Sequence, residues 1–142
     1  MQFVLDTDHL SILQQESAPA CARLLARLDQ CPAEEVAVTI VSFQEQMQGW
    51  LAYLNQARNP SGILRAYAEL KRMLEYYCES TVLAFDRRAQ DRFADLRNQH
   101  VRIGTLDLRI ASIALANSSR LLTRNLRDFR QVPGLSVDDW TK

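Results

Sequence analysis

Apolar residues along this chain follow two alternating patterns. Short uninterrupted apolar runs alternate with longer stretches in which apolar residues recur every three or four positions. An unbroken short run suits a strand buried on both faces of a parallel sheet, and the wider spacing suits an amphipathic helix. The pattern predicts strands at Phe3–Leu5, Val36–Val41, Thr81–Phe85 and Arg120–Thr123, with a possible edge strand at Leu135–Val137.

The helical stretches lie between these runs. Strands that alternate with helices predict the α/β class, as a three-layer α/β/α fold around a central parallel sheet of four to five strands. The length of 142 residues predicts a single domain over residues 1–142. The predicted helices cover residues 9–15, Pro19–Leu28, Ser42 to about Arg58, Ile63–Tyr77, Asp86 to about Asn98 and a stretch from Thr105, and residues 125–129 form a loop or a single turn.

Several predicted helix boundaries rest on residues that can cap a helix. Thr7 or Asp8 is expected to cap the first helix, and Thr105 the late one. Ser42 and Glu45 form the S-x-x-E pattern of a capping box. A turn at residues 59–62 joins two long helices. Residues 42–78 are therefore expected to form a helical hairpin that projects from the sheet and offers a dimer or partner surface.

Composition narrows the functional classes. The 17 basic and 17 acidic residues cancel, which excludes a protein that holds nucleic acid by bulk charge alone. Three cysteines without C-x-x-C spacing predict reduced thiols and a cytoplasmic location. Asp6 interrupts the apolar start, so no signal peptide is expected, and no apolar run approaches the roughly 20 residues that span a bilayer.

Four acidic residues occupy equivalent places in the predicted topology. Asp6 and Asp128 follow strands, and Glu45 and Asp107 lie in the first turns of helices. In a parallel sheet, at least three of them, Asp6, Glu45 and Asp128, fall at the same edge. Each also has a local explanation as a turn residue, a capping-box partner or a charge at a helix N-terminus.

Gathering these acids carries an electrostatic cost that a cation removes. Two carboxylates at about 4 Å repel by on the order of 4 kcal/mol at an effective dielectric constant of about 20. Oxygen ligands alone suit Mg²⁺ or Mn²⁺, not zinc. Such a cluster activates water and stabilises charge on a phosphodiester. His9 and His100 are isolated in the sequence and give zinc hydrolysis little support.

Four sequence blocks resemble PIN-domain ribonucleases, and in particular the VapC-type toxins of bacterial toxin–antitoxin pairs. The blocks are LDTD, S-x-x-E with Gly49 four residues later, IGTLDLRIASIALA and LLTRNLRDFRQVPGLSVDDW. The resemblance implies RNA cleavage that depends on Mg²⁺ or Mn²⁺, a homodimer and a cognate antitoxin partner. The family's catalytic and metal-binding acids fall on Asp6, Glu45, Asp107 and Asp128, and the supporting polar residues on Thr7, Thr123 and Asn125.

Two features of the sequence modify this interpretation. Asp8 stands where many relatives carry asparagine, which adds a negative charge beside the site. A pocket of acids repels RNA, so nearby arginines must attract it, and Arg124 and Arg127 on either side of Asn125 are the candidates.

Other interpretations remain open at this point. Asp6-Thr7-Asp8 mimics the D-x-D nucleophile motif of haloacid-dehalogenase-type phosphatases, although the chain has no Gly-Asp pair and only two lysines, Lys71 and Lys142. The other alternative is a catalytically inactive PIN-like module that binds RNA or protein without cutting. Retention of all four acids argues against that alternative.

Overall fold

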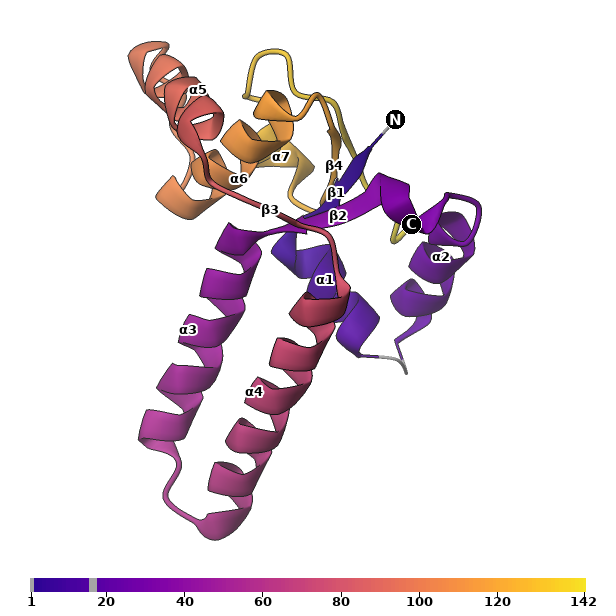
Figure 1. The fold of residues 1–142 in the computed structure, drawn as a ribbon, viewed down its shortest axis with the longest axis vertical. Coiled ribbons are helices and arrows are strands. Elements are labelled where there is room, and N and C mark those ends of the chain that lie inside the picture. The colour runs from indigo at the N-terminus through magenta and orange to yellow at the C-terminus, as the bar shows by residue number, and fades with distance from the viewer. Residues whose placement is uncertain (1, 16–17) are drawn as a thin grey trace.

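A five-stranded parallel sheet forms the centre of the part of the chain that the structure, a computed structural model, describes: residues 2–15 and 18–142. The strand order is β3-β2-β1-β4-β5, and every neighbouring pair is parallel. The predicted three-layer α/β/α fold is confirmed (Figure 1). The strands are β1 (Phe3–Leu5), β2 (Val36–Thr39), β3 (Val82–Leu83), β4 (Arg120–Leu122) and β5 (Val137–Asp138).

Helices cover both faces of this sheet. A single 3₁₀ turn, Ala33–Glu35, leads into β2. The short predicted turn after β4 is a four-residue helix, α7. The helices are α1 (Thr7–Gln14), α2 (Pro19–Leu28), α3 (Ile40–Gln56), α4 (Pro60–Glu79), α5 (Arg87–Asn98), α6 (Thr105–Ala116) and α7 (Leu126–Phe129).

Successive residues of the central strands point into two separate cores. Val4 and Leu121 pack with side chains of α5, α6 and α7, whereas Leu5 and Leu122 pack with side chains of α1, α2 and α4. This alternation is the period of two that a strand imposes on its side chains. All four residues are at most 1% exposed, so these two strands are buried on both faces, as their unbroken apolar runs predict.

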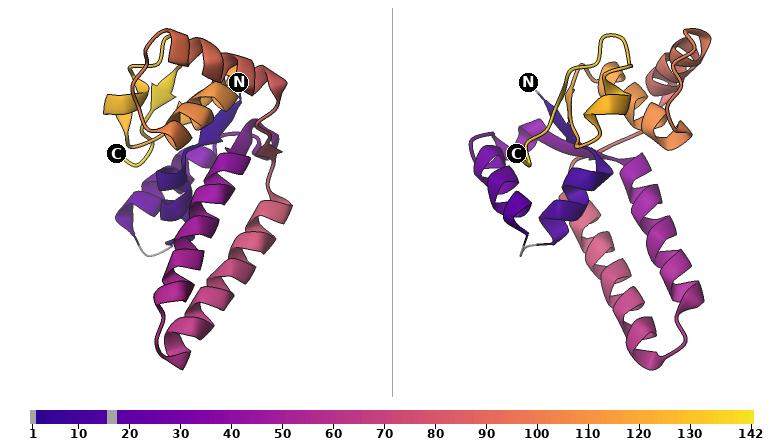
Figure 2. Two further views of the ribbon diagram at one scale, coloured as in Figure 1. Left: turned by 90° about the vertical axis from the view of Figure 1, so that its left-hand side faces the viewer. Right: turned by 180° about the vertical axis from the view of Figure 1, so that it is seen from behind.

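Helices α3 and α4 form the predicted hairpin. Both views of Figure 2 show the hairpin extending away from the sheet and the other helices. Residues at helical spacing on the inner side of α4, Ala66, Met73 and Tyr77, are buried. Asn59 caps α4 by accepting a hydrogen bond from Gly62 N at 2.9 Å. The predicted turn at residues 59–62 is therefore wrong, because Pro60 already lies in the first turn of the helix.

The expected caps of α1 and α6 are also wrong. Asp6 is the N-cap of α1: its extended backbone lets Oδ1 accept a hydrogen bond from Thr7 N at 2.8 Å. Thr7 and Asp8 consequently lie inside the helix. Gly104, which has no side chain to accept a bond, precedes α6, and Thr105 is the first residue of that helix.

The predicted capping box of α3 is replaced by a different cap. Strand β2 ends at Thr39, two residues earlier than expected. Thr39 Oγ1 accepts a hydrogen bond from Ser42 N at 3.1 Å, so the helix begins at Ile40. Glu45 therefore has no capping role.

The edge strand lies later than predicted, at Val137–Asp138, while Leu135 packs against the core.

None of the helices within the described residues is long and apolar enough to cross a membrane.

Leu24 and Leu25 provide a matched test of the core that α2 covers. Leu24 is completely buried and Leu25 is 44% exposed, although they are neighbours in one helix. Leu24→Ala should lower the free energy of unfolding by about 2–5 kcal/mol, because it removes apolar contacts and leaves a cavity. Leu25→Ala should change it by less than about 0.5 kcal/mol. Chemical denaturation of the two variants measures the difference, and equal values would contradict the packing of α2.

Candidate active site

Asp6 lies at the carboxyl end of β1, where its backbone and side chain are both fixed. Its N–H donates to Leu122 O at 2.9 Å, which continues the pairing of β1 with β4. Carboxylate Oδ2 accepts a bond from Thr123 Oγ1 at 2.7 Å, and Oδ1 accepts the capping bond from Thr7 N. With only 5% of its surface exposed, the Asp6 carboxylate can present just a narrow edge to a ligand.

Glu45 points to the same place from the second turn of α3. Glu45 Oε1 lies 2.8 Å from Thr7 Oγ1, and Ser42 Oγ lies 2.9 Å from the same hydroxyl. A carboxylate is the stronger acceptor, so Thr7 donates its single proton to Glu45 and can accept one from Ser42. Thr7 therefore orients Glu45 towards the end of β1.

Asp107, in the first turn of α6, completes a group of three acids. One carboxylate oxygen each from Asp6, Glu45 and Asp107 lies within 4.8 Å of the others. We call these three residues the acid cluster. No arginine or lysine side chain pairs with them among the ion pairs of the described residues. Three oxygen ligands at this spacing can hold one divalent cation.

Asp128 lies beside the acid cluster and not within it. Asn125 Nδ2 donates to Asp128 Oδ2 at 3.0 Å, and the Asn125 amide oxygen caps α7 by accepting from Asp128 N at 3.4 Å. The charge of Asp128 contributes to a raised pKa of Asp107, which places the two carboxylates within electrostatic range. The structure thus brings three of the four predicted acids together and leaves the fourth as a near neighbour.

Repulsion and burial shift the proton equilibria of the acid cluster. Burial raises the pKa of the Asp6 carboxyl to about 7, and the charge of Asp8 adds to the rise. Burial likewise raises the pKa of Asp107 to about 6, with Glu45 as the next cause. Near neutral pH, the cation-free cluster therefore keeps part of its protons, and cation binding must release them.

Sequence reasoning missed a connection between Asp8 and the C-terminal segment. His9 is completely buried, and its Nε2 accepts a bond from Trp140 N at 3.1 Å. The ring proton consequently sits on Nδ1, which donates to Asp8 Oδ1 at 2.8 Å. Asp8 Oδ2 accepts from Arg124 N at 2.9 Å. No local pattern signals these contacts, because His9 and Trp140 are 131 residues apart.

The two predicted RNA-contacting arginines differ in how the chain holds them. Arg124 is tied at its backbone to Asp8, and its side chain is exposed. Arg127 lies in α7 and is also exposed. Arg124 directly precedes Asn125 and Arg127 follows it by two residues, so both exposed side chains lie close in the chain to the residue that bonds Asp128.

Comparison with known families agrees with this geometry. The PIN domain family matches residues 3–135, which is most of the chain. The chain belongs to the PIN domain family. The haloacid-dehalogenase interpretation of Asp6-Thr7-Asp8 is thereby wrong.

Individual relatives extend the similarity over the full length of this PIN-domain chain. It is 26% identical over 144 residues to "Ribonuclease VapC1" of Haemophilus influenzae strain R2866, and the match covers all of both chains. The structure of VapBC-1 from nontypeable Haemophilus influenzae has the same fold, with a TM-score of 0.78 at 21% identity over all of both chains. A toxin–antitoxin complex from Klebsiella pneumoniae gives a TM-score of 0.69 at 20% identity over 98% of each chain.

Asp6→Asn should flatten the pH dependence of stability in the cation-free protein. The pKa of Asp6 in the folded state lies above its ordinary value of 3.8, so the folded protein binds this proton more tightly than the unfolded chain. Stability is then highest at low pH and falls as the pH rises from about 4 to 7. Asparagine cannot titrate but keeps an oxygen for the Thr7 N–H bond.

Urea unfolding in EDTA across this pH range measures the effect. Asp91→Asn, on an exposed residue of α5, is the control and should retain the wild-type slope. An Asp6→Asn profile as steep as that of the wild type would show that Asp6 does not hold the proton.

Proposed function

We propose that this PIN-domain protein is a metal-dependent endoribonuclease that hydrolyses RNA phosphodiester bonds and acts as the toxin of a toxin–antitoxin pair. The observation that carries the proposal is the acid cluster, which gathers Asp6, Glu45 and Asp107 at one edge of the sheet. The full-length similarity to a ribonuclease supports the same reaction. An RNA substrate and free thiols at Cys21, Cys31 and Cys78 both suit the cytoplasm.

The donor set fits Mg²⁺ or Mn²⁺. Asp6, Glu45 and Asp107 offer carboxylate oxygens only, which these hard cations prefer, and Asp128 lies near enough to add its charge. Burial and neighbouring carboxylates raise the pKa values of Asp6 and Asp107. Among the ion pairs of the described residues, none supplies a compensating positive charge to the cluster. A bound cation would supply that charge and stabilise the negative charge that develops on a phosphodiester during attack by water.

The supporting residues fix the acids before substrate arrives. Thr123 holds Asp6, Thr7 orients Glu45, and Asn125 restrains Asp128. These bonds limit the rotation of each carboxylate, so little reorganisation is needed when cation and substrate bind.

Exposed arginines near the site offset its negative charge. Arg124 and Arg127 are proposed to contact RNA phosphates and so to attract a substrate that the carboxylates alone would repel. An antitoxin segment that carries its own arginine or lysine would neutralise the same carboxylates and block the site. The similarity to a toxin–antitoxin complex makes such a protein the expected partner.

The outer face of the hairpin is proposed to join two copies of this chain. Leu64, Tyr67 and Leu74 of α4 are 70%, 59% and 58% exposed, and Leu51 of α3 is 44% exposed. The spacing of the three α4 residues places them on one face of the helix. An apolar stripe of this kind on a projecting hairpin is typical of a protein–protein interface, and the dimer implied by the family resemblance would cover it.

Asp107→Asn separates a catalytic from a structural role of this residue. If Asp107 holds the cation, the substitution relieves repulsion and should leave the EDTA-treated protein equally or more stable. Millimolar Mn²⁺ should then stabilise the variant far less than the wild type, because ligand binding raises stability by RT ln(1 + [L]/Kd). Cleavage of a mixed RNA should fall by orders of magnitude.

Thermal unfolding in EDTA and in Mn²⁺, paired with the RNA cleavage assay, makes this test. If Asp107 only interacts with the N-terminus of α6, the variant should instead lose about 0.3–1 kcal/mol and cleave normally. That result would remove Asp107 from the site. A wild-type protein that binds Mn²⁺ and RNA without cutting would favour the inactive binding module.

Leu74→Lys should convert the proposed dimer into a monomer. The charge would have to be buried unpaired between two copies, whereas on a monomer it stays in solvent. Light scattering after size-exclusion chromatography at micromolar concentration measures the mass. Leu25→Lys, on an exposed position of α2, is the matched control and should remain dimeric. A wild-type monomer would contradict the assembly.

A further inference from the structure

A groove adjoins the acid cluster and continues along the hairpin. It encloses about 560 Å³ and is lined at one end by Thr7 and Glu45. Further along, its lining includes Gly49 and Trp50 of α3 and Arg65 of α4. We call it the hairpin groove. A polymer whose phosphodiester reaches the acid cluster can therefore extend directly into this groove.

An aromatic and cationic group lines the hairpin groove beyond the acids. The guanidinium carbon of Arg65 lies 5.7 Å from the ring centroids of both Trp50 and Tyr53. The two rings meet edge to face at 5.4 Å. Cation–π attraction holds the Arg65 head group over these rings. Arg65 forms no ion pair with a carboxylate within the described part of the chain, so its positive charge is available to a ligand.

The wall of the groove on the side of α1 is fixed by side-chain hydrogen bonds. Gln46 Oε1 accepts from Tyr77 Oη at 2.9 Å, and Gln46 Nε2 donates to Gln14 Oε1 at 2.9 Å. The acidic Glu69 in the lining is paired with Arg72 at 3.1 Å, which offsets its charge. The groove is thus a preformed polar channel with exposed ring surface and one unpaired guanidinium.

The groove and the apolar stripe use different faces of α4. Arg65, Glu69 and Arg72 recur at intervals of four and three residues and face the groove. Leu64 and Tyr67 lie about 100° and about 160° from Arg65 around the helix and belong to the stripe. An apolar partner therefore has its own surface, and the groove presents ring faces and positive charge instead.

We propose that the hairpin groove binds the single-stranded part of the RNA substrate next to the cleaved phosphodiester, with bases stacked on Trp50 and Tyr53 and a phosphate held by Arg65. This inference rests on the proposed function and names the form of its substrate. The faces of aromatic rings stack on unpaired bases, whereas the bases of a duplex stack on one another and are not accessible to side chains. Continuity with the acid cluster places the bound strand in line with the reacting site.

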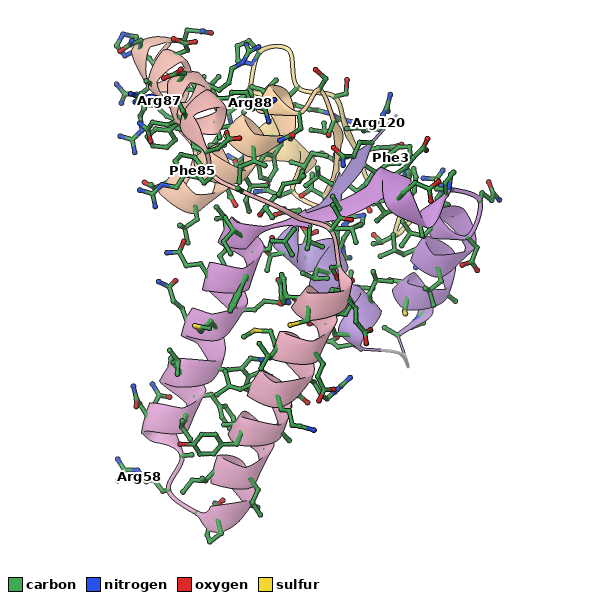
Figure 3. The ribbon with its side chains drawn as sticks, in the orientation of Figure 1. Phe3, Arg58, Phe85, Arg87, Arg88 and Arg120 are labelled. Carbon is green, nitrogen blue, oxygen red and sulfur yellow. The ribbon has the colours of Figure 1, made fainter. Side chains whose placement is uncertain are left out.

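Binding of a short RNA tests the stacking contact. The probe is a fluorescein-labelled 12-nucleotide RNA without secondary structure. Its binding is measured by fluorescence anisotropy, with Ca²⁺ as the divalent cation. Trp50→Ala should weaken binding roughly tenfold, and Trp50→Phe should keep most of the affinity, because it retains a ring. Arg65→Gln should weaken binding and reduce its salt dependence. Arg87→Gln is the matched control on α5, far from the hairpin that ends near Arg58 (Figure 3).

Gly49 allows a second test that does not remove a packed side chain. Gly49 is exposed, and no atom lies within 4 Å of a Cβ added there, so a side chain can begin at this position without a clash. Gly49→Ala and Gly49→Leu both remove glycine from a helix interior and should both be at least as stable as the wild type. Only leucine extends well into the groove, so only Gly49→Leu should weaken RNA binding and raise KM for cleavage, with kcat preserved.

The outcomes separate this inference from the proposed function. Equal RNA affinity and KM in wild type, Trp50→Ala and Gly49→Leu would overturn the groove as an RNA site. If these variants lost only the binding of an inhibitory protein, the groove would be a protein site and the RNA proposal would be overturned. Duplex RNA that competed as well as single-stranded RNA would also overturn it. Groove-dependent binding without any cleavage by the wild type would instead overturn the proposed nuclease while supporting the RNA site.

Discussion

Repulsion among carboxylates at one edge of the sheet is the constraint on which the rest of this structure depends. Burial and a neighbouring negative charge raise the pKa of Asp6 to about 7, so the cluster forms at an energetic cost. Bonds from two parts of the chain offset this cost: the neighbouring Thr7 N–H and the Thr123 hydroxyl, 117 residues away at the end of β4, both donate to Asp6. Strand pairing of β1 with β4 brings these parts together.

The central sheet explains why the acids can converge at all. Asp6 and Thr123 each follow directly on neighbouring parallel strands, Asp107 lies in the first turn of α6, and Glu45 lies in the second turn of α3. Because β1 and β4 are buried on both faces, the end of each strand is rigidly placed. A site assembled on strand ends and the first two turns of helices needs little help from loops, which suits a reaction that requires fixed ligands.

The sequence predicted most elements because their patterns are strong. Helix Pro19–Leu28 matches its prediction, and the buried strands were recognisable from unbroken apolar runs. The caps were harder, since Asp6, Thr7 and Asp8 are all able to cap a helix and only backbone geometry chooses among them. Thr39, which caps α3, lies inside the apolar run Val36–Val41, so the sequence pattern assigned it to the strand.

Contacts between distant residues set the limit of sequence reasoning at the site. The edge argument placed Asp6, Glu45 and Asp128 together, whereas the structure groups Asp107 with Asp6 and Glu45 and leaves Asp128 beside them. The position of Asp128 depends on how Asn125 caps a four-residue helix. The bond between His9 and Trp140 left no periodic signal. The meeting of Arg65 with Trp50 depends on the register of two helices joined at the hairpin tip, which a single sequence does not encode in any local pattern.

The hairpin has a consequence for how such proteins diversify. Helix α4 carries a buried face with Ala66 and Met73, a groove face with Arg65, and an outer face with Leu64. Substitutions on either exposed face leave the buried face unchanged, so their effects on stability are small and nearly additive. Substitutions on the outer face and on the groove face can therefore accumulate independently of each other, while the acid cluster at the end of β1 keeps its geometry.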